Sequence, residues 1–306
     1  MKIGIIGCGR WGKNHAKHLS ELECDLIGIC DVNPTIEDFA KECHTNFFKD
    51  YKELTSKTDG VVVLTPTNTH YDMVKFALEQ GKHVFVEKPA ASTAKQVSEL
   101  VKIASEKNLV LNTGYLFRFN PAVLNLKERL NEVGQIRLIS ATNIHEREAR
   151  RDSGAILNLG IHPLDVILFM TAERPYNVSC MTSGSAGVEK AAVITLDYGP
   201  YVAVVEVACE AQGLRKKGIS VIGEYATLEV DFLEQILTKY VQGSKPEVWT
   251  PKQKVDCLRE ELQHYLNCIK NGNLDNIGKE DVVTTRICDY AFQSAIKRTK
   301  VDLKWD

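Results

Sequence analysis

The glycine-rich run Gly7–Gly12, which reads G-C-G-R-W-G, constrains the fold of this chain more than any other feature. It follows an apolar stretch of strand length, Lys2–Ile6, and opens an amphipathic stretch, Arg10–Leu22. In such a strand–turn–helix unit the glycines permit a tight turn, close approach of a pyrophosphate, and close packing of helix on strand. The run predicts a parallel α/β sheet that binds a dinucleotide; a glycine turn without a ligand is the alternative. The residues expected to hold the pyrophosphate are Gly7, Gly9, Arg10, Trp11 and Gly12.

An acidic residue supports the dinucleotide interpretation. Asp31 directly follows the apolar residues of the next expected strand, Leu26–Cys30, and lies 19 residues after Gly12. An acid at this place hydrogen-bonds the 2′-hydroxyl of the adenosine ribose, and it repels the 2′-phosphate of NADP. The neighbours Val32 and Asn33 offer no arginine for that phosphate. We therefore expect NAD as the cofactor.

Short apolar runs alternate with amphipathic stretches over the first 118 residues. This alternation is typical of right-handed βαβ crossovers and of a parallel sheet covered by helices on both faces. It predicts a NAD-binding Rossmann domain over residues 1–118. Further expected strands are Gly60–Leu64, His83–Val86 and Leu109–Asn112, and further expected helices are Thr35–Glu42, Asn68–Gln80 and Thr93–Lys107.

The pattern changes after residue 118, and from residue 177 to residue 241 several strand-like stretches follow one another. This pattern predicts an α+β domain over residues 119–306, built on a large, open, mostly antiparallel sheet, so that the whole chain is of the α/β class. The expected strands are Gln135–Glu146, Val178–Thr182, Ala191–Asp197, Tyr201–Cys209, Gly218–Ile222 and Ala226–Val230. The expected helices are Pro121–Glu132, Gly154–Thr171, Val255–Lys270 and Lys279–Thr299.

Two loops follow central strands of the first domain, where α/β sheets bind their ligands. One carries Thr65, Pro66, Asn68 and His70, and the other carries Glu87, Lys88 and Pro89. We expect both loops to contact the cofactor. Asn68 also fits the N-cap of the helix that follows, and Glu87 with Lys88 fits a solvated charge pair as the alternative.

Four motifs in this order resemble the glucose–fructose oxidoreductase and inositol dehydrogenase (Gfo/Idh/MocA) family. They are the glycine run, P-x-N-x-H at Pro66–His70, the signature Glu87-Lys88-Pro89, and G-x-H-x-x-D at Gly160–Asp165. The resemblance covers essentially the whole chain. It implies a Rossmann domain followed by an open-faced sheet domain, a tightly held nicotinamide cofactor, and oxidation or reduction of a sugar or polyol hydroxyl.

The resemblance also implies catalytic roles that agree with the chemistry of the side chains. Oxidation of a secondary alcohol requires a group that removes the hydroxyl proton, and an imidazole with a pKa near neutrality suits this task. His162 is expected to be this base or proton relay, and Lys88 to stabilise the developing alkoxide. Glu87 is expected near the nicotinamide ribose. For His162 the alternative is a core histidine.

The substrate side is less sharply defined by the sequence. Asn158 stands four residues before His162, where many polyol-oxidising members have Asp, and this variant resembles the nucleotide-sugar 3-dehydrogenases of the family. Arg150 and Arg151 suit a diphosphate group, or they belong to a mixed surface cluster of charges. Tyr115 and Arg118 either line the substrate side, or Arg118 only braces the domain crossover. Asp165, from the same motif as His162, completes the expected substrate-binding set.

The leading prediction is an NAD-dependent 3-dehydrogenase of a UDP-N-acetylhexosamine or of its uronic acid. The alternatives are a dehydrogenase of a free sugar or inositol, an NAD-using glycosidase of the same fold, and an NAD-binding sensor without turnover. The dehydrogenases differ in the substrate from which they form NADH, and the glycosidase would release an aryl leaving group without net NADH. The sensor would turn over no substrate.

Composition and charge exclude several other classes of function. The 38 Lys and Arg nearly balance the 40 Asp and Glu, so that no bulk attraction to nucleic acid or to an anionic membrane is expected. No apolar stretch is long enough to span a bilayer. The nine cysteines form no C-x-x-C pair, which fits reduced thiols and a cytoplasmic location.

No metal site is predicted. His15 and His18 have a ligand-like spacing, but no further ligand set completes a site, and we expect a solvent-facing pair. Relatives in the family often associate through the open face of the second sheet. A homo-oligomer, a dimer or a tetramer, is therefore expected, with the region 188–207 suited to the interface.

Overall fold

The computed structural model describes residues 1–148, 153–184, 188–274 and 277–305. The chain forms two compact units, and each unit takes up two separate segments. The first unit consists of Met1–Gly114 and Leu258–Val283, and the second of Tyr115–Cys257 and Thr284–Asp306. The expected boundary after residue 118 lies close to the first of these divisions. The return of residues 258–283 to the first unit differs from the expected contiguous domains.

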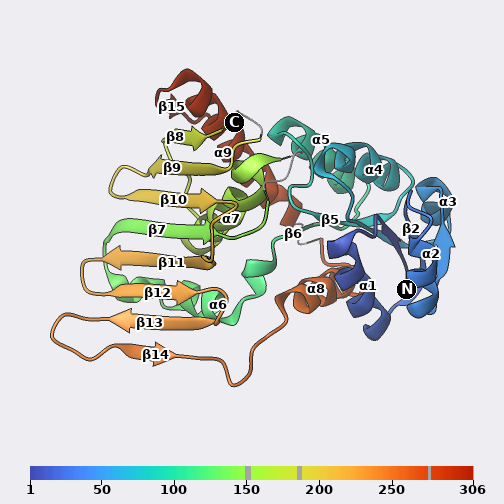
Figure 1. Cartoon of the computed structure of the whole chain (residues 1–306), viewed down its shortest axis with the longest axis horizontal. Helices are drawn as coiled ribbons and strands as arrows, with labels where there is room; N and C mark the ends of the chain where they lie inside the picture. The colour runs from blue at the N-terminus through green and yellow to red at the C-terminus, as the bar shows by residue number, and fades with distance from the viewer. Residues whose placement is uncertain (149–152, 185–187, 275–276, 306) are drawn as a thin grey trace. The chain divides into compact units, whose positions relative to one another are not determined.

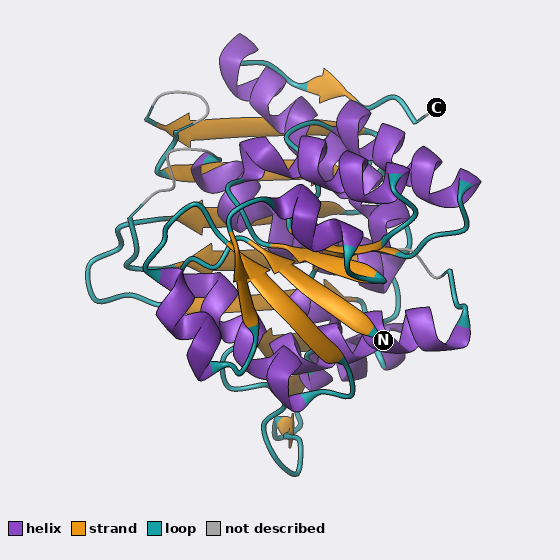
Figure 2. Ribbon diagram, turned by 90° about the vertical axis from the view of Figure 1, so that its right-hand side faces the viewer, coloured by secondary structure: helices purple, strands orange, loops and turns teal. Residues whose placement is uncertain are grey.

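The first unit is built on a six-stranded parallel sheet with the order β3-β2-β1-β4-β5-β6. Helices lie on both sides of this sheet (Figure 2). The strands are β1 (Lys2–Ile6), β2 (Asp25–Cys30), β3 (Asn46–Phe48), β4 (Gly60–Val63), β5 (His83–Glu87) and β6 (Leu111–Gly114). The helices are α1 (Arg10–Glu21), α2 (Ile36–Glu42), α3 (Tyr51–Ser56), α4 (Thr67–Glu79), α5 (Ala94–Glu106) and α8 (Cys257–Asn271). This arrangement confirms the predicted Rossmann fold.

Two apolar cores hold the helices against the sheet. On one face, side chains of α1, α2 and α8 pack with those of the central strands, among them Leu19, Phe39 and Tyr265. On the other face, α4 and α5 contribute Val74 and Leu100. Because both faces are covered, the strands have apolar side chains on both sides, as the continuous aliphatic runs predicted.

The second unit is built on a nine-stranded sheet with the order β14-β13-β12-β11-β7-β10-β9-β8-β15 (Figure 1). All its pairs are antiparallel except the parallel pair of β7 and β10. The strands are β7 (Ile136–Ile144), β8 (Asn177–Ser183), β9 (Ala191–Asp197), β10 (Val202–Ala208), β11 (Lys216–Gly223), β12 (Thr227–Asp231), β13 (Ile236–Tyr240), β14 (Glu247–Trp249) and β15 (Val301–Asp302). The predicted open, mostly antiparallel sheet is confirmed.

Helices accompany this second sheet. They are α6 (Pro121–Glu128), α7 (Ile161–Thr171) and α9 (Ile277–Lys297), whose first residues, up to Val283, belong to the first unit. Two 3₁₀ turns, η1 (Leu116–Phe119) and η2 (Leu130–Val133), flank α6, and a π-helical turn, η3 (Ile156–Gly160), precedes α7. The predicted helix over 154–171 is therefore a π turn followed by an α-helix.

The side chains of the second sheet alternate between buried and accessible positions. On β9, Ala192, Ile194 and Leu196 are buried, whereas Val193 between them is accessible. On β10 the same alternation buries Ala203 and leaves Val202 accessible. One face of this sheet is thus a packed core and the other is uncovered. Within the described ranges, none of the helices is long and apolar enough to cross a membrane.

Candidate functional site

The glycine turn between β1 and α1 has the shape that a pyrophosphate requires. Gly7 has a φ of +90°, and a Cβ atom there would lie 2.7 Å from the side chain of Thr65. A Cβ atom on Gly12 would lie 2.6 Å from the carbonyl oxygen of Gly7, so that only glycine lets the helix approach this turn. At Gly9, in contrast, a Cβ atom would meet nothing within 4 Å. The backbone of Gly9 is therefore open to a ligand, and the start of α1 carries no side-chain cap that would compete for its N–H groups.

Asp31 lies directly beside this turn. Its Oδ2 atom accepts a hydrogen bond from the backbone N–H of Cys8 at 2.6 Å, and its Oδ1 atom accepts one from Asn33 at 2.8 Å. These bonds fix the carboxylate next to the predicted pyrophosphate site, at the end of β2. The arrangement fits an adenosine ribose, and the next residue, Val32, is almost fully exposed and supplies no positive charge.

His70 connects the two loops that follow β4 and β5. Its Nδ1 atom lies 2.8 Å from the carbonyl oxygen of Pro89, and its Nε2 atom lies 2.7 Å from that of Thr65. The imidazole is buried, and its contacts join the two loops to each other. His70 thereby fixes Thr65 and Pro89, which belong to the two loops that are expected to contact the cofactor.

Asn68 does not cap the helix that it was expected to begin. Helix α4 starts one residue earlier, at Thr67, with Pro66 as the N-cap residue and no side-chain cap. The hydroxyl of Thr69 instead donates to the carbonyl oxygen of Pro66 at 2.7 Å. The interpretation of Asn68 as an N-cap is wrong because Pro66, with its fixed φ, initiates the helix. A contact between Asn68 and the cofactor stays a prediction.

Glu87 is the centre of a buried polar cluster. The indole Nε1–H of Trp11 donates to its Oε1 atom at 2.5 Å, and Nε2 of His15 lies 3.1 Å from the same oxygen. A carboxylate oxygen of Glu261 on α8 completes the group, in which the atoms of His15, Glu87 and Glu261 lie within 4.8 Å of one another. The three residues could offer ligand atoms to a metal ion, but the bonds to Glu87 already form a hydrogen-bonded network.

The charge state of Glu87 follows from this cluster. Burial raises the pKa of its carboxyl group, but the hydrogen bond and charge of His15, the charge of Lys88 and the bond from Trp11 outweigh that effect. The pKa of Glu87 therefore lies below its usual value, and the group is a carboxylate at neutral pH. Glu87 is thus a structured, buried anion, which differs from the alternative of a solvated charge pair.

The expectation of a solvent-facing pair at His15 and His18 is wrong for His15, whose side chain is fully buried. The helical period of α1 indicates the burial of His15, since His15 and Leu19 are four residues apart on the buried side of this helix. Glu261 was missed altogether. It stands beside Leu258, Leu262 and Tyr265 in the apolar stripe of α8, and an acid in such a stripe is itself an indication of a buried polar partner.

A second acid that the sequence analysis missed fixes the loop after Lys88. Asp281 on α9 is buried, and its Oδ2 atom accepts hydrogen bonds from the N–H of Ala90 at 2.9 Å and from the hydroxyl of Thr113 at 3.2 Å. The half-buried Lys88 itself donates its backbone N–H to Oε2 of Glu87 at 3.1 Å. Lys88 therefore lies in a segment that is held on both sides by carboxylates.

In the second unit, His162 lies in the first turn of α7, directly after the π turn η3. The imidazole is 8% exposed, and the ring of Phe117 packs against it edge-on at 5.3 Å between ring centres. Asn158 is half-buried within the π turn. A π turn inside a helix is frequent at functional sites.

The start of this helical segment is held by Glu189, another buried acid that was missed. Its Oε1 atom accepts a hydrogen bond from the N–H of Ile156 at 2.9 Å, and its carbonyl oxygen accepts one from the N–H of Ala155 at 2.9 Å. The carboxylate thus takes the place of a cap residue and sets where the turns that carry Asn158 and His162 begin.

Arg118 and Asp165 form a buried ion pair with each other. The guanidinium donates from Nε at 2.9 Å and from Nη2 at 2.5 Å, and the side chains are 6% and 1% exposed. The guanidinium also lies 5.5 Å from the ring centre of Tyr115, which is buried as well. This geometry favours the alternative in which Arg118 has a structural role at the crossover. Its partner Asp165, on α7, fixes the position of the guanidinium. Arg150 and Arg151 lie outside the described residues.

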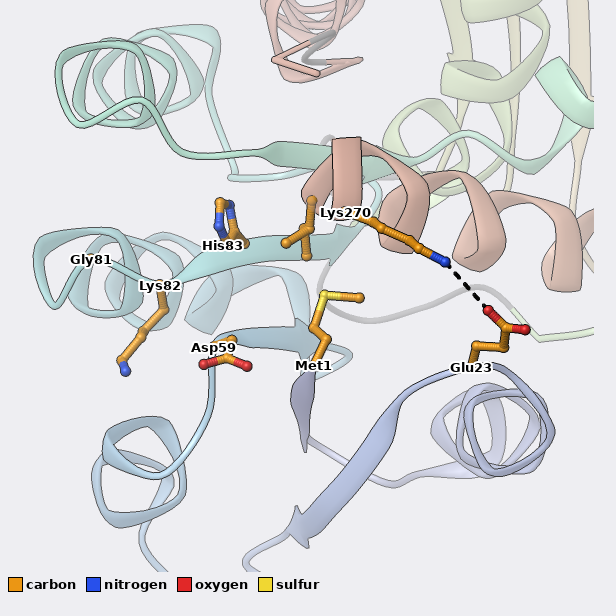
Figure 3. A pocket seen from close by; sticks show the side chains of 8 residues that line it. Met1, Glu23, Asp59, Gly81, Lys82, His83 and Lys270 are labelled. Carbon is orange, nitrogen blue, oxygen red and sulfur yellow. Dashed lines mark ion pairs between the residues drawn. The ribbon is translucent and has the colours of Figure 1, made fainter. Parts of the chain in front are cut away.

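One depression of the first unit lies at the end of its sheet opposite to the glycine turn. It measures about 650 Å³ and lies at the amino ends of β4 and β5, between Asp59, Lys82, His83 and Lys270 (Figure 3). Its charges are engaged within the protein, because Lys270 pairs with Glu23 at 3.6 Å and Lys82 donates to the carbonyl oxygen of Thr58. The dinucleotide turn follows the carboxyl end of β1, so this depression is separate from the candidate site.

Comparisons with known proteins agree with this geometry. Residues 1–115 match the model of an oxidoreductase family with an NAD-binding Rossmann fold, and residues 125–229 match the model of the GFO/IDH/MocA C-terminal domain. The UDP-N-acetylglucosamine 3-dehydrogenase of Acidithiobacillus ferrooxidans is 29% identical over 284 residues, 88% of each chain. The myo-inositol 2-dehydrogenase of Thermotoga maritima is 26% identical in an alignment that covers 98% of this chain and 97% of that one.

Solved structures show the same similarity. A structure of the Acidithiobacillus ferrooxidans enzyme covers 97% of both chains with a TM-score of 0.85 and 26% identity. A levoglucosan dehydrogenase in complex with NADH and levoglucosan covers 100% of both chains with a TM-score of 0.90, and its 18% identity indicates a shared fold.

Proposed function

This chain belongs to the GFO/IDH/MocA family of NAD-binding oxidoreductases, and from that premise we propose that it oxidises C3 of a nucleotide sugar, a UDP-N-acetylhexosamine or its uronic acid. The observation that carries the substrate class is the similarity to a UDP-N-acetylglucosamine 3-dehydrogenase across 88% of both chains. Asn158, four residues before His162, supports the same class.

The glycine turn and Asp31 are proposed to hold the cofactor. The open backbone of Gly9 and the uncapped start of α1 would receive the pyrophosphate, together with Arg10 and Trp11. The carboxylate of Asp31 would bind the adenosine ribose. Thr65, Pro66, Asn68 and Glu87 would line the nicotinamide half, and His70 would position their loops.

The proton chemistry is assigned to two residues. When bound, NAD supplies the acceptor for the hydride that leaves the alcohol carbon. His162 takes the hydroxyl proton through its imidazole, while the ammonium of Lys88 stabilises the negative charge that develops on the oxygen. Asn158 orients a neighbouring hydroxyl by a hydrogen bond. The products are a keto sugar, NADH and one proton.

We also propose that the protein works in the cytoplasm as a homo-oligomer, a dimer or a tetramer. All nine cysteines are free thiols that are buried or half-buried, which suits a reducing compartment. The uncovered face of the second sheet supports the oligomer and includes a shallow hollow of about 330 Å³ between Met181, Val193 and Glu206. This assembly would protect the apolar residues of that face from water.

The test is NADH formation with a substrate panel: UDP-N-acetylglucosamine, its uronic acid, myo-inositol and free hexoses, each with a ketone trap. We expect a signal with a UDP-sugar. His162→Asn should lower kcat by about 10²–10⁴-fold because it removes the base, with NAD affinity within about twofold of the wild type. His44→Asn is the matched control, since His44 is exposed and its φ of +52° suits asparagine.

Other outcomes would replace the proposal. A signal with myo-inositol alone would favour the inositol alternative, which the similarity to the Thermotoga maritima enzyme supports. Release of an aryl leaving group from a glycoside, without net NADH, would identify the glycosidase. A wild type that binds NAD but turns over no compound would identify the sensor.

A further inference from the structure

We propose that Lys217 selects substrates that carry an anionic group, a carboxylate or a phosphate, close to the reacting sugar ring. The inference rests on the proposed function and narrows its substrate class. It concerns a residue of β11 to which the sequence analysis assigned no role.

The ammonium of Lys217 and the imidazole of His162 contact the same aromatic ring. Nζ of Lys217 lies 5.7 Å from the centre of the Phe117 ring, and the imidazole of His162 packs edge-on against that ring at 5.3 Å. The ring centre of Phe232 lies 4.6 Å from that of Phe117, so that Phe232 also holds the Phe117 ring in place. A positive charge is therefore placed one side chain away from the proposed base, within the same compact unit.

The strand register explains why Lys217 points to this side of the sheet. Lys217 is the direct cross-strand partner of Asn143 on β7. Asn143 is buried and donates from Nδ2 to the carbonyl oxygen of Leu159 in the π turn, at 2.9 Å. Since paired residues of neighbouring strands share a face, Lys217 lies on the face that carries the π turn and His162. Lys216, one residue earlier, lies on the opposite face and is exposed.

The charge distinguishes the substrate classes. The hydroxyls of inositol or of a neutral hexose need donors and acceptors but no cation. A lysine is a compact point charge with three donors, which suits a carboxylate or a phosphate. The half-buried position of Lys217 beside the ring of Phe117 strengthens such a bond, because water screens it less there than at the surface. A structural role, in which Lys217 packs against Phe117, is the competing explanation.

The experiment measures ligand binding to the NADH complex of the full chain by calorimetry. The ligands are UDP, UDP-N-acetylglucosamine, its uronic acid, glucose 6-phosphate and myo-inositol. The variants are Lys217→Met, Lys217→Arg as the charge-conserving replacement, and Lys216→Met as the matched control on the opposite face. Thermal unfolding of each variant verifies that it is folded.

We expect Lys217→Met to weaken anionic ligands by about tenfold to a hundredfold, the size of one charge-assisted hydrogen bond. Lys217→Arg should stay within about threefold and Lys216→Met within about twofold of the wild type. A loss confined to the uronic acid identifies a sugar carboxylate as the bound group. An equal loss for UDP and both UDP-sugars identifies the diphosphate, and a loss for glucose 6-phosphate identifies a sugar phosphate.

The inference is overturned if Lys217→Met binds all ligands like the wild type, or if it loses affinity for myo-inositol to the same extent. Its failure is distinguishable from that of the proposed function. Turnover of a UDP-sugar that is independent of Lys217 refutes only the inference. Lys217-dependent binding of glucose 6-phosphate, without turnover of any UDP-sugar, refutes only the nucleotide-sugar substrate.

Discussion

At the scale of single residues, the carboxylate of Asp31 should decide between NAD and NADP. Asp31→Ser keeps a small hydrogen-bond acceptor near the N–H groups of Cys8 and Asn33 but removes the charge. We expect NAD affinity to fall by about tenfold, the loss of one charge-assisted bond, and NADP affinity to rise because the repulsion of its 2′-phosphate disappears. Fluorescence titration with NADH and NADPH measures both. Asp25→Ser, an exposed aspartate on β2, is the control, and an unchanged ratio of the two affinities contradicts the assignment.

The bond between His15 and Glu87 should be visible in the pH dependence of stability. The pKa of Glu87 in the folded protein lies below its ordinary value, so its carboxylate contributes stability that is present above that value and is lost as the pH falls through the folded pKa. His15→Leu removes a hydrogen bond that lowers this pKa, and burial then raises it. We expect a loss of about 1–3 kcal/mol at neutral pH and an acid transition that begins at higher pH.

Urea unfolding between pH 3 and 7 measures this effect. His18→Leu, three residues further along the same helix, is the matched control and should leave the acid transition in place. The same result for both variants would mean that the imidazole of His15 does not stabilise the Glu87 carboxylate.

The candidate site residues that the sequence offers are those that stand in short motifs. These residues are the glycine turn, Asp31, Lys88 and His162. The spacing within each motif indicates where its residues lie relative to the strand or helix that carries them. Glu261 and Asp281 could not be found in this way, because the groups they contact lie more than 150 residues earlier. Only the packing of α8 and α9 brings them there.

At the scale of elements, the pair of Arg118 and Asp165 connects η1 to α7, the helix that carries His162. Arg118→Met leaves the Asp165 carboxylate buried without its cation, which should cost about 3–5 kcal/mol of unfolding free energy. Arg118→Met with Asp165→Leu should recover much of the loss, since two apolar side chains then pack against each other. A double-mutant cycle by urea unfolding measures the coupling.

The control for this cycle is Arg129→Met, because Arg129 forms a more exposed ion pair with Glu132. If Arg118→Met keeps full stability but weakens the binding of a UDP-sugar, the brace is wrong, and the substrate-contact alternative for Arg118 takes its place.

Long elements with strong periodicity were predictable, and short ones were not. The strands β3 and β14 have three residues each, too few for a pattern, and they form because longer neighbours offer them an edge. The apolar pattern of 154–171 predicts regular helix and does not reveal the wider π turn before α7. The spacing of four residues between Asn158 and His162 therefore lacks its usual α-helical meaning.

At the scale of the whole molecule, the chain order hides which segments fold together. The alternation of strands and helices predicts two consecutive domains, yet Leu258–Val283 returns to the first unit. Its apolar stripe on α8, with Leu262 and Tyr265, joins the core under β1 and β5. Periodicity predicts that such a helix buries one face, but it contains no information on which sheet receives that face.

The uncovered face of the second sheet makes the oligomer testable. Ile222 on β11 lies on this face and is 37% exposed, while its neighbour Val221 is buried in the core. In a symmetric dimer through this face, Ile222→Glu would introduce two charges into one apolar interface and should therefore yield a 34.2 kDa monomer in size-exclusion chromatography with light scattering. Ile296→Glu on α9 is the matched control, since Ile296 is 69% exposed and lies outside the sheet, and it should leave the wild-type mass unchanged. A wild type that is monomeric at every concentration would show that this face stays in water, and its apolar residues would then need another explanation.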